Sequence, residues 1–74
     1  MWYTYFMKED SKKLGENLKK IRIKKDITQI EISRILGANR SFVSNIENGK
    51  TNPTLATITK LANAVKVSTN ELLK

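Results

Sequence analysis

The sequence predicts an all-α domain of five helices, and three features of the chain lead to this prediction. Apolar residues recur at spacings of three and four, which gathers them on one face of a helix. Outside residues 1–7, no segment alternates between apolar and polar residues as a half-buried strand does. Ser or Thr followed three positions later by Glu marks helix starts, and glycines mark helix ends. With 74 residues the chain makes one compact domain.

Residues 1–10 differ from the rest and are expected to form an aromatic N-terminal extension, with residues 11–74 as the domain proper. Four of the chain's five aromatic residues lie in this extension: Trp2, Tyr3, Tyr5 and Phe6. Two interpretations stay open. Either the extension packs on the domain or on a second subunit, or it is a leader before an alternative start at Met7. Because exposed aromatic patches are unfavourable in water, packing is favoured.

The first helix is expected over residues 11–25. Leu14, Leu18 and Ile21 fall at positions i, i+4 and i+7, on one face, and lysines cover the other faces. Asp26 stands where this helix should end.

The second helix begins at Thr28, which forms a capping box with Glu31, and it ends at Gly37 in a left-handed cap. The residues expected to point inward are Ile32 and Leu36. Two apolar residues fall off this face, Ile30 and Ile35. They either contact a partner or the aromatic extension, or are single exposed apolar residues.

The remaining helices are delimited in the same way. The third starts near the N-cap Asn39, directs Val43 and Ile46 inward and stops at Gly49. The fourth covers residues 54–65, with an apolar stripe of Leu55, Ile58, Leu61, Ala62 and Val65. The short fifth helix begins with a capping box of Ser68 and Glu71.

Composition narrows the classes of function. The chain has neither cysteine nor histidine, and its seven carboxylates form no spaced ligand set, so we expect no metal, no cofactor and no enzyme activity. A net charge of +7 favours a polyanionic partner, usually nucleic acid. No apolar run reaches the roughly 20 residues of a membrane span, and the apolar start lacks the basic flank of a secretory signal, so a cytoplasmic location is expected.

Residues 28–50 carry the functional prediction, because two short helices joined at Gly37 have the layout of a helix-turn-helix. The helix that enters a DNA major groove needs short polar or forked side chains near its N-terminus. Arg40 can bind guanine through two acceptors, and Asn45 can pair with adenine. The predicted base-reading residues are Asn39, Arg40, Ser41, Phe42, Ser44 and Asn45. For Phe42 the alternative is a core contact with the fourth helix.

Phosphate contacts are expected at the edges of the motif, where they set position and affinity rather than sequence preference. The predicted residues are Gln29, Asn48, Lys50, Thr51 and Asn52. The alternative for each of them is a solvated surface position.

Glu47 stands on the predicted DNA-facing helix, where a free carboxylate would repel phosphate. Its spacing from Val43 and Ile46 turns it inward, and a buried carboxylate needs a partner. Arg22, next to the core residue Ile21, is the predicted partner in a structural ion pair.

These motifs resemble the Cro/phage-repressor helix-turn-helix family, often called the xenobiotic-response-element family. The resemblance covers roughly residues 13–73 and rests on Thr28-Gln29, on Gly37 in the turn, and on the runs at residues 43–49 and 52–55. It implies a compact five-helix, lambda-repressor-like DNA-binding domain. It also implies a phosphate contact at Gln29, base or phosphate contacts on the third helix, and the Arg22–Glu47 pair.

Ser33 departs from the resemblance, because alanine is usual at this contact between helices two and three. The serine hydroxyl can bond back to the helix backbone. The stretch at residues 40–44 and the Asn-Pro-Thr-Leu continuation look like controller proteins of restriction–modification systems, which are dimeric regulators of about this length.

The sequence therefore predicts a DNA-binding transcriptional regulator that binds a partly palindromic operator on double-stranded DNA as a homodimer. No small-molecule ligand is expected, and the predicted dimer interface comprises Val67, Leu72 and Leu73. The alternatives are an antitoxin-like or coactivator-like protein-interaction module, a phage-type repressor, and a non-specific nucleic-acid binder that relies on the lysines of the first helix.

Overall fold

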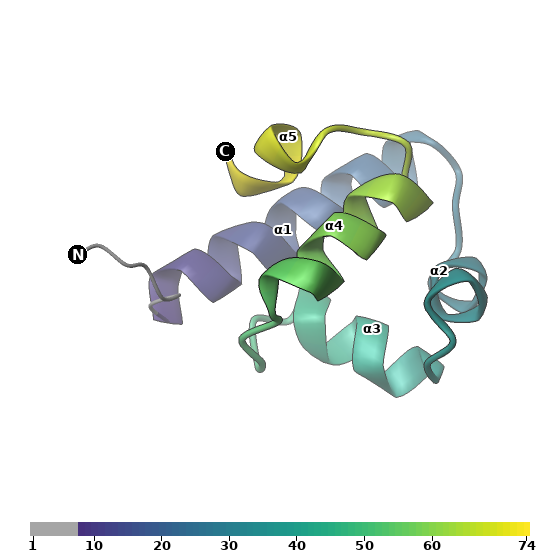
Figure 1. Ribbon diagram of the computed structural model, residues 1–74, viewed down its shortest axis with the longest axis horizontal. Coiled ribbons are helices and arrows are strands. Elements are labelled where there is room, and N and C mark those ends of the chain that lie inside the picture. Colours follow the sequence, from purple (N-terminus) through teal and green to yellow (C-terminus); the bar gives the residue numbers. More distant parts are fainter. Residues whose placement is uncertain (1–7) are drawn as a thin grey trace.

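The computed structural model describes residues 8–74, and the chain within that range forms five α-helices and no strand (Figure 1). They are α1 (Lys8–Lys24), α2 (Gln29–Leu36), α3 (Arg40–Glu47), α4 (Leu55–Ala64) and α5 (Thr69–Leu73). The predicted all-α class is confirmed. The predictions for the aromatic residues 2–6 lie outside the described residues.

The helix starts follow the local signals in the sequence. At α2, the Glu31 backbone N–H donates to Thr28 Oγ1 (3.1 Å), and the Thr28 backbone N–H donates to Glu31 Oε1 (2.8 Å), so the predicted capping box is complete. Asn39 caps α3 in the same position, accepting a bond from the Phe42 N–H. Ser68 caps α5 through the N–H of Glu71 at 3.3 Å.

The helix α1 begins at Lys8, three residues before the predicted start. Ser11 is therefore inside the helix, where its buried hydroxyl donates to Asn52 Oδ1 in the loop before α4. The end of α1 agrees with the prediction, because Asp26 adopts a left-handed backbone with φ of 62° and turns the chain toward α2.

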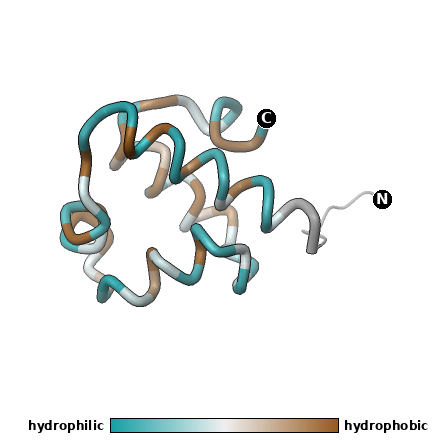
Figure 2. The backbone as a smooth tube through the Cα atoms, turned by 180° about the vertical axis from the view of Figure 1, so that it is seen from behind, coloured by the Kyte–Doolittle hydropathy of each residue, from teal (hydrophilic) through white to brown (hydrophobic). Residues whose placement is uncertain are grey.

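The core is formed by one side of every helix. Its fully buried members include Leu14, Leu18, Ile32, Val43 and Ile46, all of which were predicted to face inward. Figure 2 shows hydrophobic and hydrophilic segments alternating along the helices, as expected when each helix buries one face. Leu55 corrects the predicted α4 stripe. It is 70% exposed, because it occupies the first position of α4, beyond the reach of the core.

The helix α1 packs against α3 and α5, α2 packs against α3 and α4, and α4 packs against α5. Gly15 sets the approach of α1 to α3. A Cβ built at Gly15 would lie 2.3 Å from the Ile46 carbonyl oxygen and 2.6 Å from that of Glu47. The missing side chain thus lets α1 lie directly against the C-terminal turn of α3.

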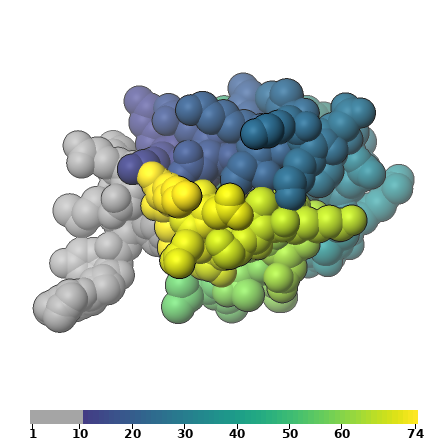
Figure 3. All heavy atoms as spheres, turned by 90° about the horizontal axis from the view of Figure 1, so that it is seen from above, coloured from purple at the N-terminus to yellow at the C-terminus, as the bar shows by residue number. Residues whose placement is uncertain are grey.

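The short helix α5 closes the fold over α1 and α4 (Figure 3). Leu72 is fully buried, and its carbonyl accepts a hydrogen bond from Asn17 Nδ2 at 2.9 Å. This corrects the prediction that Leu72 belongs to a dimer interface, since the fold of a single chain already covers it. Of the predicted trio, Leu73 is 39% exposed and Val67 is half-buried against the core.

No helix among the described residues has the length and apolar character needed to cross a lipid bilayer. Within the same part of the chain, no group of three potential metal-binding side chains comes together.

Candidate nucleic-acid interface

The turn between α2 and α3 is formed by a left-handed glycine and closed by a backbone hydrogen bond. Gly37 has a φ of 71°, a left-handed conformation that glycine adopts without steric cost. The following Ala38 N–H donates to the Ser33 carbonyl at 2.9 Å and closes the turn. Ser33 is buried at the contact with α3, and its hydroxyl donates to the Ile30 carbonyl at 2.7 Å. The serine therefore fits the tight contact by satisfying its own hydroxyl within α2.

The solvent-facing side of α3 is polar and hollowed. Arg40, Ser41 and Asn45 are exposed, Ser44 is half-buried, and these four line a surface hollow of about 300 Å³. They lie in the first six residues of α3, so the structure brings together the main part of the predicted base-reading set. Asn39 is beside them, with its side-chain oxygen engaged in the α3 cap.

Phe42 lies at the border between the polar face of α3 and its core-facing side. It is half-buried and packs against the hydrophobic core. This agrees with the alternative of a core contact, while a base contact by its exposed part stays a prediction. At about 100° per residue, Phe42 falls between Asn45 on the polar face and Ile46 in the core, which explains why it is only partly covered.

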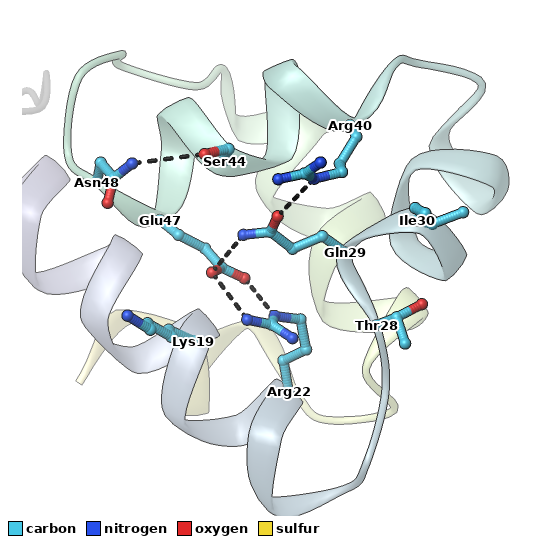
Figure 4. Close-up of a pocket in the computed structure, with 9 residues that line it drawn as sticks. All are labelled: Lys19, Arg22, Thr28, Gln29, Ile30, Arg40, Ser44, Glu47 and Asn48. Atoms are coloured by element: carbon cyan, nitrogen blue, oxygen red, sulfur yellow. Dashed lines mark hydrogen bonds and ion pairs between the residues drawn. The ribbon is translucent and has the colours of Figure 1, made fainter.

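A hydrogen-bonded chain of four polar side chains connects α1, α2 and α3 (Figure 4). Arg22 donates to Glu47 twice, from Nε to Oε2 at 2.6 Å and from Nη2 to Oε1 at 3.2 Å. Gln29 Nε2 donates to the same Glu47 Oε1 at 2.9 Å. Arg40 Nε then donates to Gln29 Oε1 at 3.2 Å. We call this set, Arg22, Glu47, Gln29 and Arg40, the polar relay.

The ion pair predicted from the position of Glu47 is thus present, with 2% of the Glu47 side chain and 15% of the Arg22 side chain exposed. Arg22 Nη1 also donates to the Ile27 carbonyl at 3.1 Å, which ties the same guanidinium to the loop before α2. A carboxylate this deeply buried is stable only with such partners.

The sequence did not indicate that the Gln29 side chain bonds to two other side chains of the interface. Its carboxamide lies between Glu47 and Arg40, with the oxygen and the nitrogen each bonded to one of them. The bond to Arg40 uses Nε and leaves both terminal guanidinium nitrogens of Arg40 without a partner among the described residues. The contact therefore fixes one edge of the Arg40 guanidinium and leaves its two terminal nitrogens as donors on the exposed side of α3.

A wider hollow of about 450 Å³ surrounds the polar relay (Figure 4). Its wall combines the relay with residues from α1, the start of α2 and α3: Lys19, Thr28, Ile30, Ser44 and Asn48. The wall contains three cationic side chains and a single carboxylate, that of Glu47, which Arg22 already pairs. The hollow is therefore electropositive, as expected of a surface that receives phosphate.

The loop after α3 exposes only part of the set of residues predicted to contact phosphate. Asn48 and Lys50 are exposed, and Asn48 Nδ2 is 3.5 Å from Ser44 Oγ. Asn52 is exposed, with its side-chain oxygen bonded to Ser11. Thr51 differs from the prediction, because its hydroxyl is buried and has no hydrogen-bond partner in the described part of the chain. In this conformation the Thr51 hydroxyl cannot reach a phosphate.

One titrating group lies at the edge of the interface. The backbone N–H of Thr28, followed by its hydroxyl, holds the pKa of Glu31 below its ordinary value, and Arg34 acts in the same direction. Glu31 therefore stays ionised at the positive end of α2, where a negative charge is favourable.

Comparison with known proteins agrees with this geometry. Residues 18–72 match the protein family described as "Helix-turn-helix". The chain is 36% identical over 63 residues to the ImmF control region 10 kDa protein of Bacillus phage phi105, covering 85% of this chain and 70% of that protein. It is 45% identical over 60 residues to an SPbeta prophage-derived HTH-type transcriptional regulator of Bacillus subtilis, covering 81% of this chain and 56% of that protein.

Among solved structures, the chain is similar to the restriction–modification controller protein C.AhdI from Aeromonas hydrophila. The two superpose with a TM-score of 0.81 at 34% sequence identity, over 86% of this chain and 97% of that one.

Proposed function

The chain belongs to the helix-turn-helix family as a DNA-binding transcriptional regulator, and we propose that it reads a partly palindromic operator as a homodimer. In this proposal α3 enters the major groove, and the polar relay behind it holds the recognition residues in place. The single observation that carries the proposal is the polar face at the start of α3, formed by Arg40, Ser41 and Asn45 with the half-buried Ser44, beside an electropositive hollow.

The dimensions and chemistry of α3 suit this task. An α-helix with its side chains is about 10–12 Å across, which matches the roughly 12 Å width of the major groove. Arg40 would bind guanine O6 and N7, Asn45 would pair with adenine N6 and N7, and the two small serines would leave room for close approach. Gln29 and Asn48 line the hollow beside this face, and Lys50 and Asn52 lie in the loop after α3. These four residues would position α3 on the phosphate backbone.

The homodimer is proposed because two copies related by a two-fold axis would present two α3 helices to half-sites one helical turn apart. With Leu72 in the core, the proposed contact surface comprises Leu73 and the edge of Val67. Sedimentation equilibrium tests it. We expect Leu73→Glu to lower the measured mass toward that of a monomer, while Leu55→Glu, at another exposed leucine, leaves it unchanged. A dimer lost only in Leu55→Glu would move the interface to the start of α4.

The regulated genes are proposed to belong to a restriction–modification system. The support for this is the similarity to the controller protein C.AhdI, which extends over 97% of that protein. The second candidate is a phage-type repressor, favoured by the likeness to the phi105 protein. The two differ in their targets. A controller's selected operator would lie upstream of an endonuclease or methyltransferase gene, whereas a phage-type repressor's would lie in a prophage control region.

Selection of bound duplexes from a random DNA library tests the function directly. We expect a palindromic consensus whose binding is lost in Arg40→Ala and kept in Lys24→Ala, a cation on the far side of α1. Binding without a consensus, or equal losses in the two variants, would point to a non-specific nucleic-acid binder. No binding at all would favour a protein-interaction module, in which deletion of residues 1–7 would abolish partner binding while the fold remains.

A further inference from the structure

We propose that α1 contributes its own row of contacts to the DNA backbone, through Lys12 and Lys19, and that Lys13 and Lys24, on another face of the helix, take no part. This inference rests on the proposed DNA-binding function and names additional residues for it. Neither lysine was singled out by the helix-turn-helix motif, which begins after α1 has ended.

Lys19 is placed by the hollow that surrounds the polar relay. It lines the wall opposite Arg40, Ser44 and Asn48, and Figure 4 shows it on α1 beside Glu47 and Arg22. Arg22 and Glu47 neutralise each other at the floor of this hollow. Lys19 is exposed and forms no ion pair with any described residue, so its ammonium group is available to an anion that approaches α3.

Lys12 is placed by the loop that follows α3. The backbone of Lys12 touches Gly49, where a Cβ would lie 3.0 Å from the Lys12 Cα. The neighbouring Ser11 donates to Asn52 in the same loop. Lys12 therefore stands beside Asn48 and Lys50, two of the residues proposed to meet phosphates.

Helical spacing places Lys12 and Lys19 on one face, because they are seven residues apart and two turns of an α-helix bring a side chain back to nearly the same direction. Glu16 is exposed beside both lysines, four residues after Lys12 and three before Lys19. It lines a separate surface hollow with Lys19, Lys20 and Ile23, and not the hollow that contains Arg40. Lys12 and Lys19 thus lie on the side of α1 that is next to α3 and the loop after it.

Two other exposed lysines of α1, Lys13 and Lys24, provide natural controls. Lys13, Asn17 and Lys24 share another face, since they are separated by four and seven residues. Asn17 bonds to the Leu72 carbonyl, so this face looks toward α5 and away from α3. A DNA duplex seated on α3 would reach Lys12 and Lys19 but not Lys13 or Lys24.

The salt dependence of DNA binding separates the two faces. The logarithm of the binding constant falls as the logarithm of the salt concentration rises, and each lysine–phosphate contact steepens this slope by about 0.9. For a fourfold rise in salt, each contact therefore lowers the affinity roughly threefold. Using the duplex selected by the wild-type protein, we expect Lys12→Gln and Lys19→Gln each to reduce the slope by about this amount. Lys13→Gln and Lys24→Gln should keep the wild-type slope. All four positions are exposed, so thermal unfolding should be the same in all four variants.

The outcomes distinguish this inference from the function on which it rests. If the wild-type protein selects no duplex, the proposed function fails. If it selects a duplex and all four variants lower the slope equally, α1 acts only through diffuse charge and the inference is overturned. An unchanged slope in Lys12→Gln and Lys19→Gln overturns it as well, while leaving the proposed function intact.

Discussion

Arg22 and Glu47 are 25 residues apart in the sequence, yet the guanidinium of one donates two hydrogen bonds to the carboxylate of the other. The pair joins α1 to the last turn of α3, and Gln29 extends it to Arg40 on the polar face. A structural ion pair and the recognition surface are therefore parts of the same polar relay. The stability of the fold and the geometry of the interface can be tested separately by changing different members of it.

Glu47→Ala should destabilise the fold strongly. It leaves Arg22 partly buried without its counter-charge, and breaking such a pair costs about 3–5 kcal/mol in the free energy of unfolding. Thermal unfolding followed by circular dichroism is the measurement. The control is Glu16→Ala, which removes an exposed carboxylate and should change the free energy of unfolding by less than about 0.5 kcal/mol. Equal midpoints for the two variants would show that the pair is superficial.

Gln29 should affect DNA recognition through Arg40. Arg40→Ala is expected to lose about 1–3 kcal/mol of discrimination at one base position. If Gln29 holds Arg40 in place, Gln29→Ala loses part of the same discrimination, and the double variant loses little more than Arg40→Ala alone. Affinities for the selected duplex and for its single-base variants give the coupling. Ser41, which has no bond to Gln29, supplies the reference: the losses of Gln29→Ala and Ser41→Ala should add.

Gly15→Ala should lower stability although alanine is the better helix former by about 1 kcal/mol. Its Cβ would collide with the Ile46 and Glu47 carbonyl oxygens and push α1 away from α3. The cost of such overpacking is typically about 1–3 kcal/mol, and backbone atoms cannot rotate out of the way as a side chain can. Urea unfolding measures the change, and a variant more stable than the wild type would contradict the close approach.

Lys66→Gly should raise stability, because Lys66 adopts a φ of 60° after α4. Left-handed backbone costs a residue with a side chain about 1–2 kcal/mol, part of which glycine recovers despite its greater freedom in the unfolded chain. Lys60→Gly is the matched control in the middle of α4, where the same replacement should destabilise by about 1 kcal/mol. The same sign of change at both positions would rule out strain at Lys66.

The capping box at α2 should make stability depend on pH in the acid range. The bonds from Thr28 lower the pKa of Glu31 in the folded chain, so the ionised form contributes stability above the unfolded pKa of about 4.3. That contribution is lost as the pH falls through the folded pKa. Melting temperatures of the wild type and of Glu31→Gln should therefore differ at neutral pH and converge as the pH falls through the lowered pKa of Glu31. A difference that is constant with pH would assign the effect to hydrogen bonding alone.

Local sequence patterns determined most of the fold. The caps at Thr28, Asn39 and Ser68, the left-handed turn at Gly37 and the inward faces of the helices all depend on residues within a few positions of one another, so they can be recognised along the chain. The Arg22–Glu47 pair could be predicted over a longer distance only because a buried carboxylate demands a cation.

Tertiary packing decided what no local pattern contains. Spacing alone could not show that α5 folds back to bury Leu72 or that Leu55 lies beyond the core. It also could not show that Phe42 packs partly against the core or that the Thr51 hydroxyl is covered. Nor could it show that Gln29 joins Glu47 to Arg40 or that Lys19 borders the same hollow. The physical reason is that helix formation and capping depend on nearby residues, whereas burial and side-chain partners depend on which helices meet.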